Sequence, residues 1–178
     1  VVPFVWASQP LREHILLDED WRFAFGNASS PEKDFGCGTE YFNYLTKAAS
    51  IHNAGPYSDK FDDSTWKRVD LPHDWVVDLP FDAQASHSHG YKTVGYRYPE
   101  TSVGWYRKTF KVPAEDLGRH ITLRFDGIFR EARIWVNGFY VGHEPSGYAT
   151  QVYDITDYLN YGGENLICVR ADATLEEG

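Results

Sequence analysis

The chain has 178 residues, of which 42% are hydrophobic, 16% aromatic and 24% charged, a composition that excludes a disordered polar chain and fits one folded domain. Its 17 basic and 26 acidic residues give a net charge of −9, and no Lys/Arg run exceeds two residues, so neither nucleic acid nor a membrane is expected as a partner. No apolar run could span a membrane, the N-terminus lacks a signal-peptide pattern, and methionine is absent even at position 1, which suggests a piece of a longer protein.

Short strands are predicted, in chain order, at residues 21–25, 67–71, 105–112, 121–125, 132–136, 151–154 and 165–172. At 121–125 and 132–136 apolar and polar residues alternate with a period of two, as they do in half-buried strands. Helix is expected only at 40–49 and 155–159, because no long segment keeps the helical period. The predicted fold class is all-β, an antiparallel two-sheet sandwich of the jelly-roll type with long loops.

Two local sequences predict more than a strand. Asn137-Gly138 stands between the strand at 132–136 and the run Phe-Tyr-Val-Gly, and Asn-Gly favours the two-residue type I′ turn of a β-hairpin. The run Leu-Ile-Cys-Val at 166–169 is continuously apolar, which indicates a strand buried on both faces. Cys168 is therefore predicted to be a buried thiol, and two cysteines do not make the dense pattern of a disulfide scaffold.

The segment Leu-Pro-His-Asp-Trp at 71–75 is interpreted as structural. Trp75 is large enough to anchor a corner of the chain in the core, and His73 and Asp74 can bond backbone groups at the turn. The segment therefore predicts a corner of the fold, with a functional role as the alternative.

Two long irregular stretches, 26–63 and 78–103, are candidates for function because loops of this length are uncommon in a compact domain. In the second, His87 and His89 would lie on one side of an extended chain, but a metal site needs further ligands that the spacing does not provide. No metal and no cofactor is predicted.

Aromatic and hydrogen-bonding side chains are concentrated in the same stretch, at His89, Tyr91, Tyr96, Arg97 and Tyr98. This composition suits a polar ring such as a sugar. It suits equally well a loop whose tyrosines pack onto the sandwich. The residues alone leave both interpretations open.

An ordered series of motifs carries a resemblance to a known family. The motifs are Leu71-Pro-His-Asp-Trp75, Val103-Gly-Trp-Tyr-Arg-Lys-Thr-Phe110, Phe125-Asp-Gly127, Ile134-Trp-Val-Asn-Gly138, Ser146-Gly-Tyr148, Tyr153-Asp-Ile-Thr156 and Gly163-Glu-Asn165. In this order and spacing the chain resembles, from about Leu17 to Asp172, the N-terminal sugar-binding domain of glycoside hydrolase family 2. Residues 33–41, 86–91 and 127–130 are most similar to the β-galactosidase type.

The resemblance implies a galactose-binding-domain-like jelly roll at residues 17–178, preceded by an extension at 1–16. In the family this domain precedes an immunoglobulin-like domain and a TIM barrel, and the barrel supplies the two glutamates of retaining hydrolysis. No catalytic residue is therefore expected in this stretch, which should be inactive by itself. A periplasmic or secreted location is expected for such a hydrolase.

The resemblance also implies where the domain meets substrate. In the family two parts reach the substrate pocket, the loop before the Val-Gly-Trp-Tyr strand and the end of the last strand, which here are residues 89–98 and 170–172. Asp172 is expected to accept hydrogen bonds from sugar hydroxyls, and His89, Arg97 and Tyr98 are expected to form a pocket wall.

The expected partners are a β-galactoside and the catalytic barrel of the same protein, and oligomerisation is left open. One alternative is a domain of a β-glucuronidase or β-mannosidase. A second is a non-catalytic carbohydrate-binding module, favoured by the tyrosine-rich loop. A third is a purely structural domain whose aromatic surface only contacts the neighbouring domains.

Overall fold

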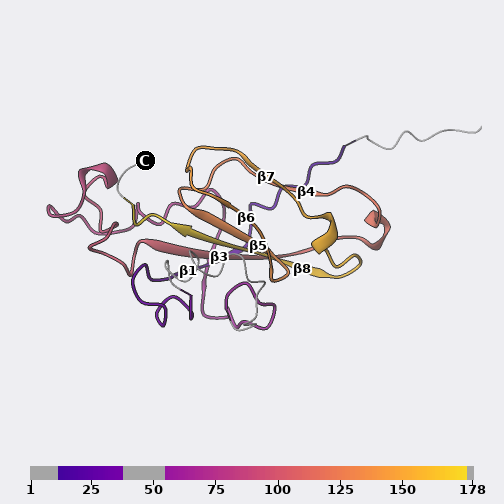
Figure 1. Cartoon of the computed structure of the whole chain (residues 1–178), viewed down its shortest axis with the longest axis horizontal. Helices are drawn as coiled ribbons and strands as arrows, with labels where there is room; N and C mark the ends of the chain where they lie inside the picture. The colour runs from indigo at the N-terminus through magenta and orange to yellow at the C-terminus, as the bar shows by residue number, and fades with distance from the viewer. Residues whose placement is uncertain (1–11, 38–54, 176–178) are drawn as a thin grey trace, which may run out of the picture.

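The computed structural model describes residues 12–37 and 55–175, and these form an antiparallel β-sandwich (Figure 1). The larger sheet has six strands in the order β2-β1-β3-β8-β5-β6, and the smaller sheet pairs β4 with β7. The strands are β1 Trp21–Phe25, β2 Lys67–Val69, β3 Val103–Lys111, β4 Thr122–Phe125, β5 Ala132–Val136, β6 Phe139–Glu144, β7 Gln151–Asp154 and β8 Glu164–Asp172. The predicted all-β fold class is confirmed.

Helical structure in the described residues is limited to single 3₁₀ turns. These turns are η1 His87–His89, η2 Ala114–Asp116 and η3 Thr156–Tyr158. The helix predicted at 155–159 is thus one 3₁₀ turn, and the helix predicted at 40–49 lies outside the described residues. None of the helical turns in the described ranges is long and apolar enough to cross a membrane.

Strands β3 and β8 form the centre of the larger sheet and pair along nine residues, from Val103 with Asp172 to Lys111 with Glu164. The prediction began this strand two residues late because Gly104 is a poor strand former. The structure requires glycine there: a Cβ at this position would lie 2.9 Å from the rings of Phe23 and Trp75.

Strand β2 is two residues shorter than predicted. It pairs with β1 only as far as Val69, opposite Trp21. At the next position the Asp70 carboxylate, rather than a backbone carbonyl, accepts the hydrogen bond of the Asp20 amide, at 2.8 Å. Because a side chain accepts this hydrogen bond in place of the backbone, strand β2 ends at Val69.

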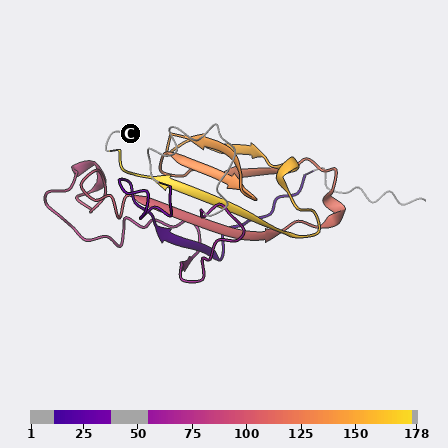
Figure 2. The ribbon, with the colours of Figure 1, turned by 60° about the horizontal axis from the view of Figure 1, so that its bottom comes forward.

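The larger sheet is buried on both faces, as the run Leu-Ile-Cys-Val predicts. On one face Ile167 and Val169 pack in a cluster that includes Leu123 of β4, so the smaller sheet covers this side (Figure 2). On the other face Cys168 packs with Trp105 and Trp135 under residues of the irregular segments 27–37 and 55–66. Loops therefore take the place of a covering sheet on that side.

The corner at 71–75 is structural, in agreement with its interpretation from sequence. Trp75 stacks on Phe23 with ring centroids 5.9 Å apart, and its Nε1 donates to the Thr101 carbonyl at 2.9 Å. His73 differs from the expectation: its Nδ1 lies 2.9 Å from the Tyr106 hydroxyl instead of bonding the backbone. Burial lowers the pKa of His73, which favours the neutral ring.

The predicted hairpin turn is confirmed. Asn137 and Gly138 both have positive φ, 50° and 84°, and they join Val136 of β5 to Phe139 of β6. These are the conformations that a type I′ turn requires. Asn137 also ties the turn to β8, because its Oδ1 accepts from the Leu166 amide at 2.8 Å.

Replacing Gly138 with alanine tests this turn. At Gly138 a Cβ would meet nothing closer than the Tyr57 carbonyl at 3.7 Å, so only the positive φ opposes a side chain. We expect Gly138→Ala to lower the free energy of unfolding by about 1–2 kcal/mol in urea titrations. Gly163→Ala is the matched control, with a nearest contact of 3.7 Å and no positive φ. Equal losses in the two variants would contradict the turn assignment.

Candidate functional site

Several loops meet at the end of the larger sheet where β3 begins and β8 ends. Next to the Val103–Asp172 pair, the Ala173 amide donates to the Ser102 carbonyl at 2.8 Å. The Asp172 amide donates to the Arg130 carbonyl at 2.8 Å, and the Gly26 amide donates to Val103 at 2.9 Å. The loop before β3 and the end of β8 lie together at this end of the molecule (Figure 1).

Asp172 is the one predicted site residue that the sheet itself positions. Its side chain is 3% exposed, and Oδ2 accepts from Nη1 of Arg170 at 3.0 Å. Oδ1 accepts from the Thr174 amide at 3.0 Å and from the Thr174 hydroxyl. The carboxylate is therefore held on both oxygens, and a ligand would meet it in a fixed orientation.

Arg170 is buried completely and is held by a second carboxylate. Nε of its guanidinium donates to Oδ2 of Asp34 at 3.1 Å, Nη2 forms an ion pair with the same oxygen at 3.0 Å, and Asp34 is also 0% exposed. Oδ1 of Asp34 accepts from Nε1 of Trp105 at 2.7 Å and from the Asn27 amide at 3.1 Å. A buried guanidinium is tolerated only when it is paired and hydrogen-bonded in this way.

A second buried guanidinium makes these carboxylates more important. Arg133 of β5 pairs with Arg170 across the sheet and is also buried. Burial lowers the pKa of Arg133, and the charge of Arg170 lowers it further. Two adjacent cations inside the protein require acidic groups nearby: Asp34 and Asp172 pair with Arg170, and the charges of Glu131 and Asp172 favour the charged form of Arg133.

Sequence reasoning missed Asp34, Thr174 and Ser102. A signal existed for the first: an arginine within an apolar strand that is buried on both faces needs a partner. The partner could not be identified from spacing, since Asp34 and Arg170 are 136 residues apart in the chain.

The loop before β3 is closed by its own contacts. The Tyr98 hydroxyl donates to Asp82 at 2.6 Å, and Nζ of Lys92 donates to the carbonyls of Val77 and Leu79 at 2.9 and 2.7 Å. The hydrogen bond from Tyr98 lowers the pKa of Asp82, and the same bond raises the pKa of Tyr98. These contacts within the loop give it a defined shape.

The loop is joined to the end of the sheet by Ser102. The Ser102 hydroxyl accepts from the Gly95 amide at 2.9 Å and donates to the Tyr98 carbonyl at 2.6 Å. Because Ser102 also bonds Ala173, the backbone of Tyr98 and the end of β8 belong to one hydrogen-bonded unit.

The other predicted wall residues are dispersed along this loop. The Tyr98 side chain turns to Asp82, and Nη1 of Arg97 donates to the Gln84 carbonyl at 3.2 Å. His89 is half-buried in η1, at the turn farther along the loop. The structure thus brings Asp172 and the backbone of Tyr98 to one end of the sheet, and it directs the Arg97 and Tyr98 side chains into the loop.

The two histidines do not lie in an extended segment. They begin and end the 3₁₀ turn η1, and the ring of His87 contacts Tyr91 edge to face, with centroids 5.5 Å apart. Within residues 12–37 and 55–175, no group of three or more His, Cys, Asp or Glu side chains could hold a metal ion.

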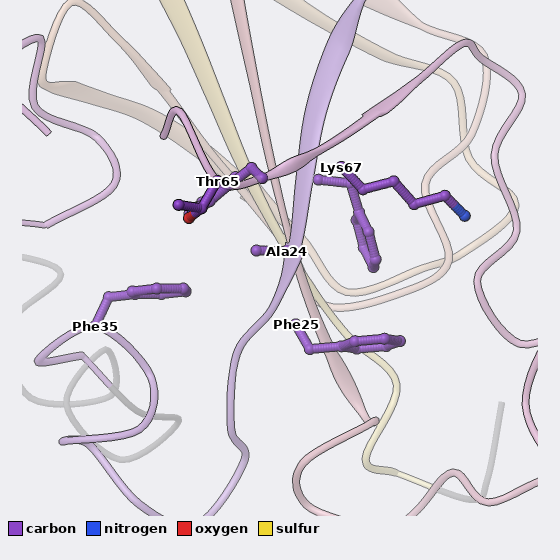
Figure 3. A pocket seen from close by; sticks show the side chains of 7 residues that line it. Ala24, Phe25, Phe35, Thr65 and Lys67 are labelled. Carbon is purple, nitrogen blue, oxygen red and sulfur yellow. The ribbon is translucent and has the colours of Figure 1, made fainter. Parts of the chain in front are cut away.

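An open groove of about 370 Å³ lies at the outer edge of β1 (Figure 3). It lies beside the first residue of β2, where Lys67 pairs with Phe23, and it is lined by Phe23, Ala24, Phe25, Phe35, Thr65, Trp66 and Lys67. In Figure 3 the Lys67 ammonium points away from Phe35. None of the four predicted site residues lines this groove, so it is separate from the end of β8.

The family model for the sugar binding domain of the family 2 glycosyl hydrolases matches residues 15–172. The chain belongs to this family. Beta-galactosidase BoGH2A of Bacteroides ovatus is 38% identical over 112 residues, which are 63% of this chain and 13% of that protein. A beta-glucuronidase of Formosa agariphila is 29% identical over 112 residues, which are 63% of this chain and 11% of that protein.

Solved structures agree with this family 2 sugar-binding domain. A glycosyl hydrolase family 2 member from Bacteroides cellulosilyticus superposes with a TM-score of 0.64 at 34% identity, over 90% of this chain and 17% of that one. The chain thus spans between 11% and 17% of the length of these proteins. Its architecture is that of one domain within much longer enzymes.

Replacing Tyr98 with phenylalanine tests the closure of the loop. Asp82 should then lose the hydrogen bond that lowers its pKa, and the pKa should rise toward the ordinary 3.8 in an NMR titration of the carboxyl carbon. A group whose pKa is lowered by folding stabilises the protein above its unfolded pKa and loses this contribution at lower pH. The melting temperature of Tyr98→Phe should therefore be lower than that of the wild type at pH 7. The difference between the two melting temperatures should become smaller below pH 3.8.

Tyr96→Phe is the control for this variant. It also removes one tyrosine hydroxyl, but Tyr96 is 65% exposed. We expect no change in the Asp82 pKa and no change in melting temperature. A Tyr98→Phe protein that matches Tyr96→Phe in both measurements would contradict the closed loop.

Proposed function

We propose that this domain belongs to a retaining β-galactosidase-type hydrolase, where it braces the catalytic barrel and forms one side of the pocket for a terminal β-galactoside. The observation that carries the proposal is the carboxylate of Asp172, fixed on both oxygens where β8 ends among the loops. A pre-oriented acceptor can bond a sugar hydroxyl without a further ordering cost.

The burial of Asp172 is consistent with this role. Asp172 is only 3% exposed in this domain, so a sugar hydroxyl that bonds it would have to enter the small accessible part of this site. Arg97 and Tyr98, whose side chains fix the loop beside this end, would act as walls by giving that loop its shape.

Relatives of both substrate classes match this domain at similar identity. A β-galactosidase of Bacteroides ovatus is 38% identical over 112 residues, and a putative β-glucuronidase of Formosa agariphila is 36% identical over 118 residues. The galactoside is proposed as the substrate because the β-galactosidase-type segments at 33–41, 86–91 and 127–130 are present. A β-glucuronidase is the second candidate, since proteins with that name match the same domain.

The substrate is tested with the full-length protein that carries this chain. We expect it to hydrolyse 4-nitrophenyl β-galactoside with retention of configuration, and with a higher kcat/KM than the β-glucuronide or β-mannoside. Preference for the glucuronide would reassign the substrate while leaving the family unchanged.

Asp172→Asn in that full-length enzyme tests the contribution of this domain to the pocket. We expect kcat/KM to fall roughly 10- to 100-fold, the size expected when a charged hydrogen-bond acceptor for substrate is removed. Asp63→Asn is the matched control, since Asp63 also pairs with a buried arginine, at 2.7 Å from Nε of Arg107. If both variants lose thermal stability and neither loses turnover, the domain has only a structural role.

The 178-residue chain alone should hydrolyse none of these glycosides, because the family places both catalytic glutamates in another domain. Calorimetric titration with galactose and galacto-oligosaccharides should detect no binding, since one wall of a pocket is not a complete site. Sub-millimolar affinity would instead support a carbohydrate-binding module. Loss of that affinity in Tyr96→Ala would then assign it to the tyrosine-rich loop.

A further inference from the structure

We propose that Asp34 is a positioning residue for Asp172 and acts through Arg170. The three side chains form a continuous line in which Asp34 holds one edge of the guanidinium and Asp172 accepts from its far end. The inference rests on the proposed role of Asp172 toward substrate and adds two residues to it.

The shape of the guanidinium makes this coupling directional. Its donors lie in one plane at fixed angles, so fixing one edge also fixes the directions of the remaining N–H bonds. Asp34 bonds the edge formed by Nε and Nη2, at 3.1 and 3.0 Å. Nη1 then points to Oδ2 of Asp172, at 3.0 Å. Asp34 thus sets the direction from which Asp172 is held.

Asp34 is itself held rigidly. Trp105 of β3 and the Asn27 amide donate to its Oδ1, at 2.7 and 3.1 Å. The backbone at Gly26 presses so closely on it that a Cβ there would lie 2.0 Å from Oδ1. The carboxylate has no room to follow Arg170 if the guanidinium moves, so the guanidinium must stay aligned with it.

The sheet adds a second constraint. Arg170 pairs with Trp105 across β3 and with Arg133 across β5, and its guanidinium carbon lies 5.9 Å from the Trp105 ring. Arg133 repels the charge of Arg170, so Arg170 requires the negative charge of Asp34 in order to stay beside Asp172. A neutral residue of the same shape would fill the space without supplying this charge.

Asp34→Asn in the full-length enzyme separates positioning from mere stabilisation. We expect kcat/KM per folded molecule to fall about tenfold, as for one charge-assisted hydrogen bond, on the aryl glycoside that the enzyme hydrolyses best. In an Asp172→Asn background the same change should alter kcat/KM less than twofold, because its effect passes through Asp172. The matched control Asp63→Asn should leave kcat/KM unchanged in both backgrounds.

Trp105→Phe provides a second variant if Asp34→Asn does not fold. It removes the Nε1 donor from Asp34 and keeps both carboxylates charged. We expect a two- to fivefold loss of kcat/KM that disappears in the Asp172→Asn background. Measurement of kcat and KM separately, with melting temperatures, distinguishes this result from a general loss of stability.

The outcomes separate the inference from the proposed function. If Asp172→Asn is impaired while Asp34→Asn and Trp105→Phe match wild type, or reduce kcat/KM equally in both backgrounds, Asp34 does not position Asp172 and only the inference is wrong. If Asp172→Asn itself retains wild-type kcat/KM, the role of Asp172 is wrong and the inference fails with it.

Discussion

A strand that is buried on both faces has no solvent in which to place a charge, and β8 carries Arg170 near its end. The ion pairs of this guanidinium with Asp34 and Asp172 are the interactions on which the rest of this end of the molecule depends. Removing one partner of a buried pair leaves an uncompensated charge, which costs far more than the pair contributes when intact. The segment that carries Asp34 must therefore lie against the sheet wherever β8 is correctly placed.

The two faces of the larger sheet are covered in different ways. The smaller sheet, β4 and β7, covers only one face of the larger sheet. The other face is covered by irregular segments whose buried residues include Cys37, Tyr57 and Trp66. Backbone in such segments has no ladder to satisfy its polar groups, so side chains such as Asn27 and Asp34 accept its amides. The long loops therefore cover one side of the core, and one of them also carries Asp34, the buried carboxylate that pairs with Arg170.

Local sequence patterns were sufficient for much of the fold. The strands at 21–25, 132–136 and 151–154 and the Asn137-Gly138 turn depend on alternation and on backbone conformation within a few residues, and the structure places them as predicted. The errors at β2 and β3 arise where a distant group decides the outcome. At β3, for example, the rings of Phe23 and Trp75 leave room only for glycine.

The candidate site was less accessible to sequence reasoning for the same reason. The ion pair of Asp34 with Arg170 spans 136 positions, and no spacing rule connects a glycine-rich loop to the last strand. Tyr98 illustrates the opposite case. The sequence indicates this residue as a candidate but does not indicate what its side chain contacts. Its hydroxyl could bond a sugar or the loop, and only the position of Asp82 shows that it bonds the loop.

The motifs that identify the family are mostly parts of the framework. Trp75 anchors a corner of the chain, and the absence of a side chain at Gly104 leaves room for the rings of Phe23 and Trp75. Asn137 and Gly138 form a turn that is hydrogen-bonded to β8. Framework residues do not contact the sugar in this account, which is consistent with matches to proteins named for galactosides and to proteins named for glucuronides. Under the proposed function, discrimination between sugars depends on groups that this framework orients toward the pocket. Asp172, which Arg170 and Thr174 hold in place at the end of β8, is the candidate for such a group.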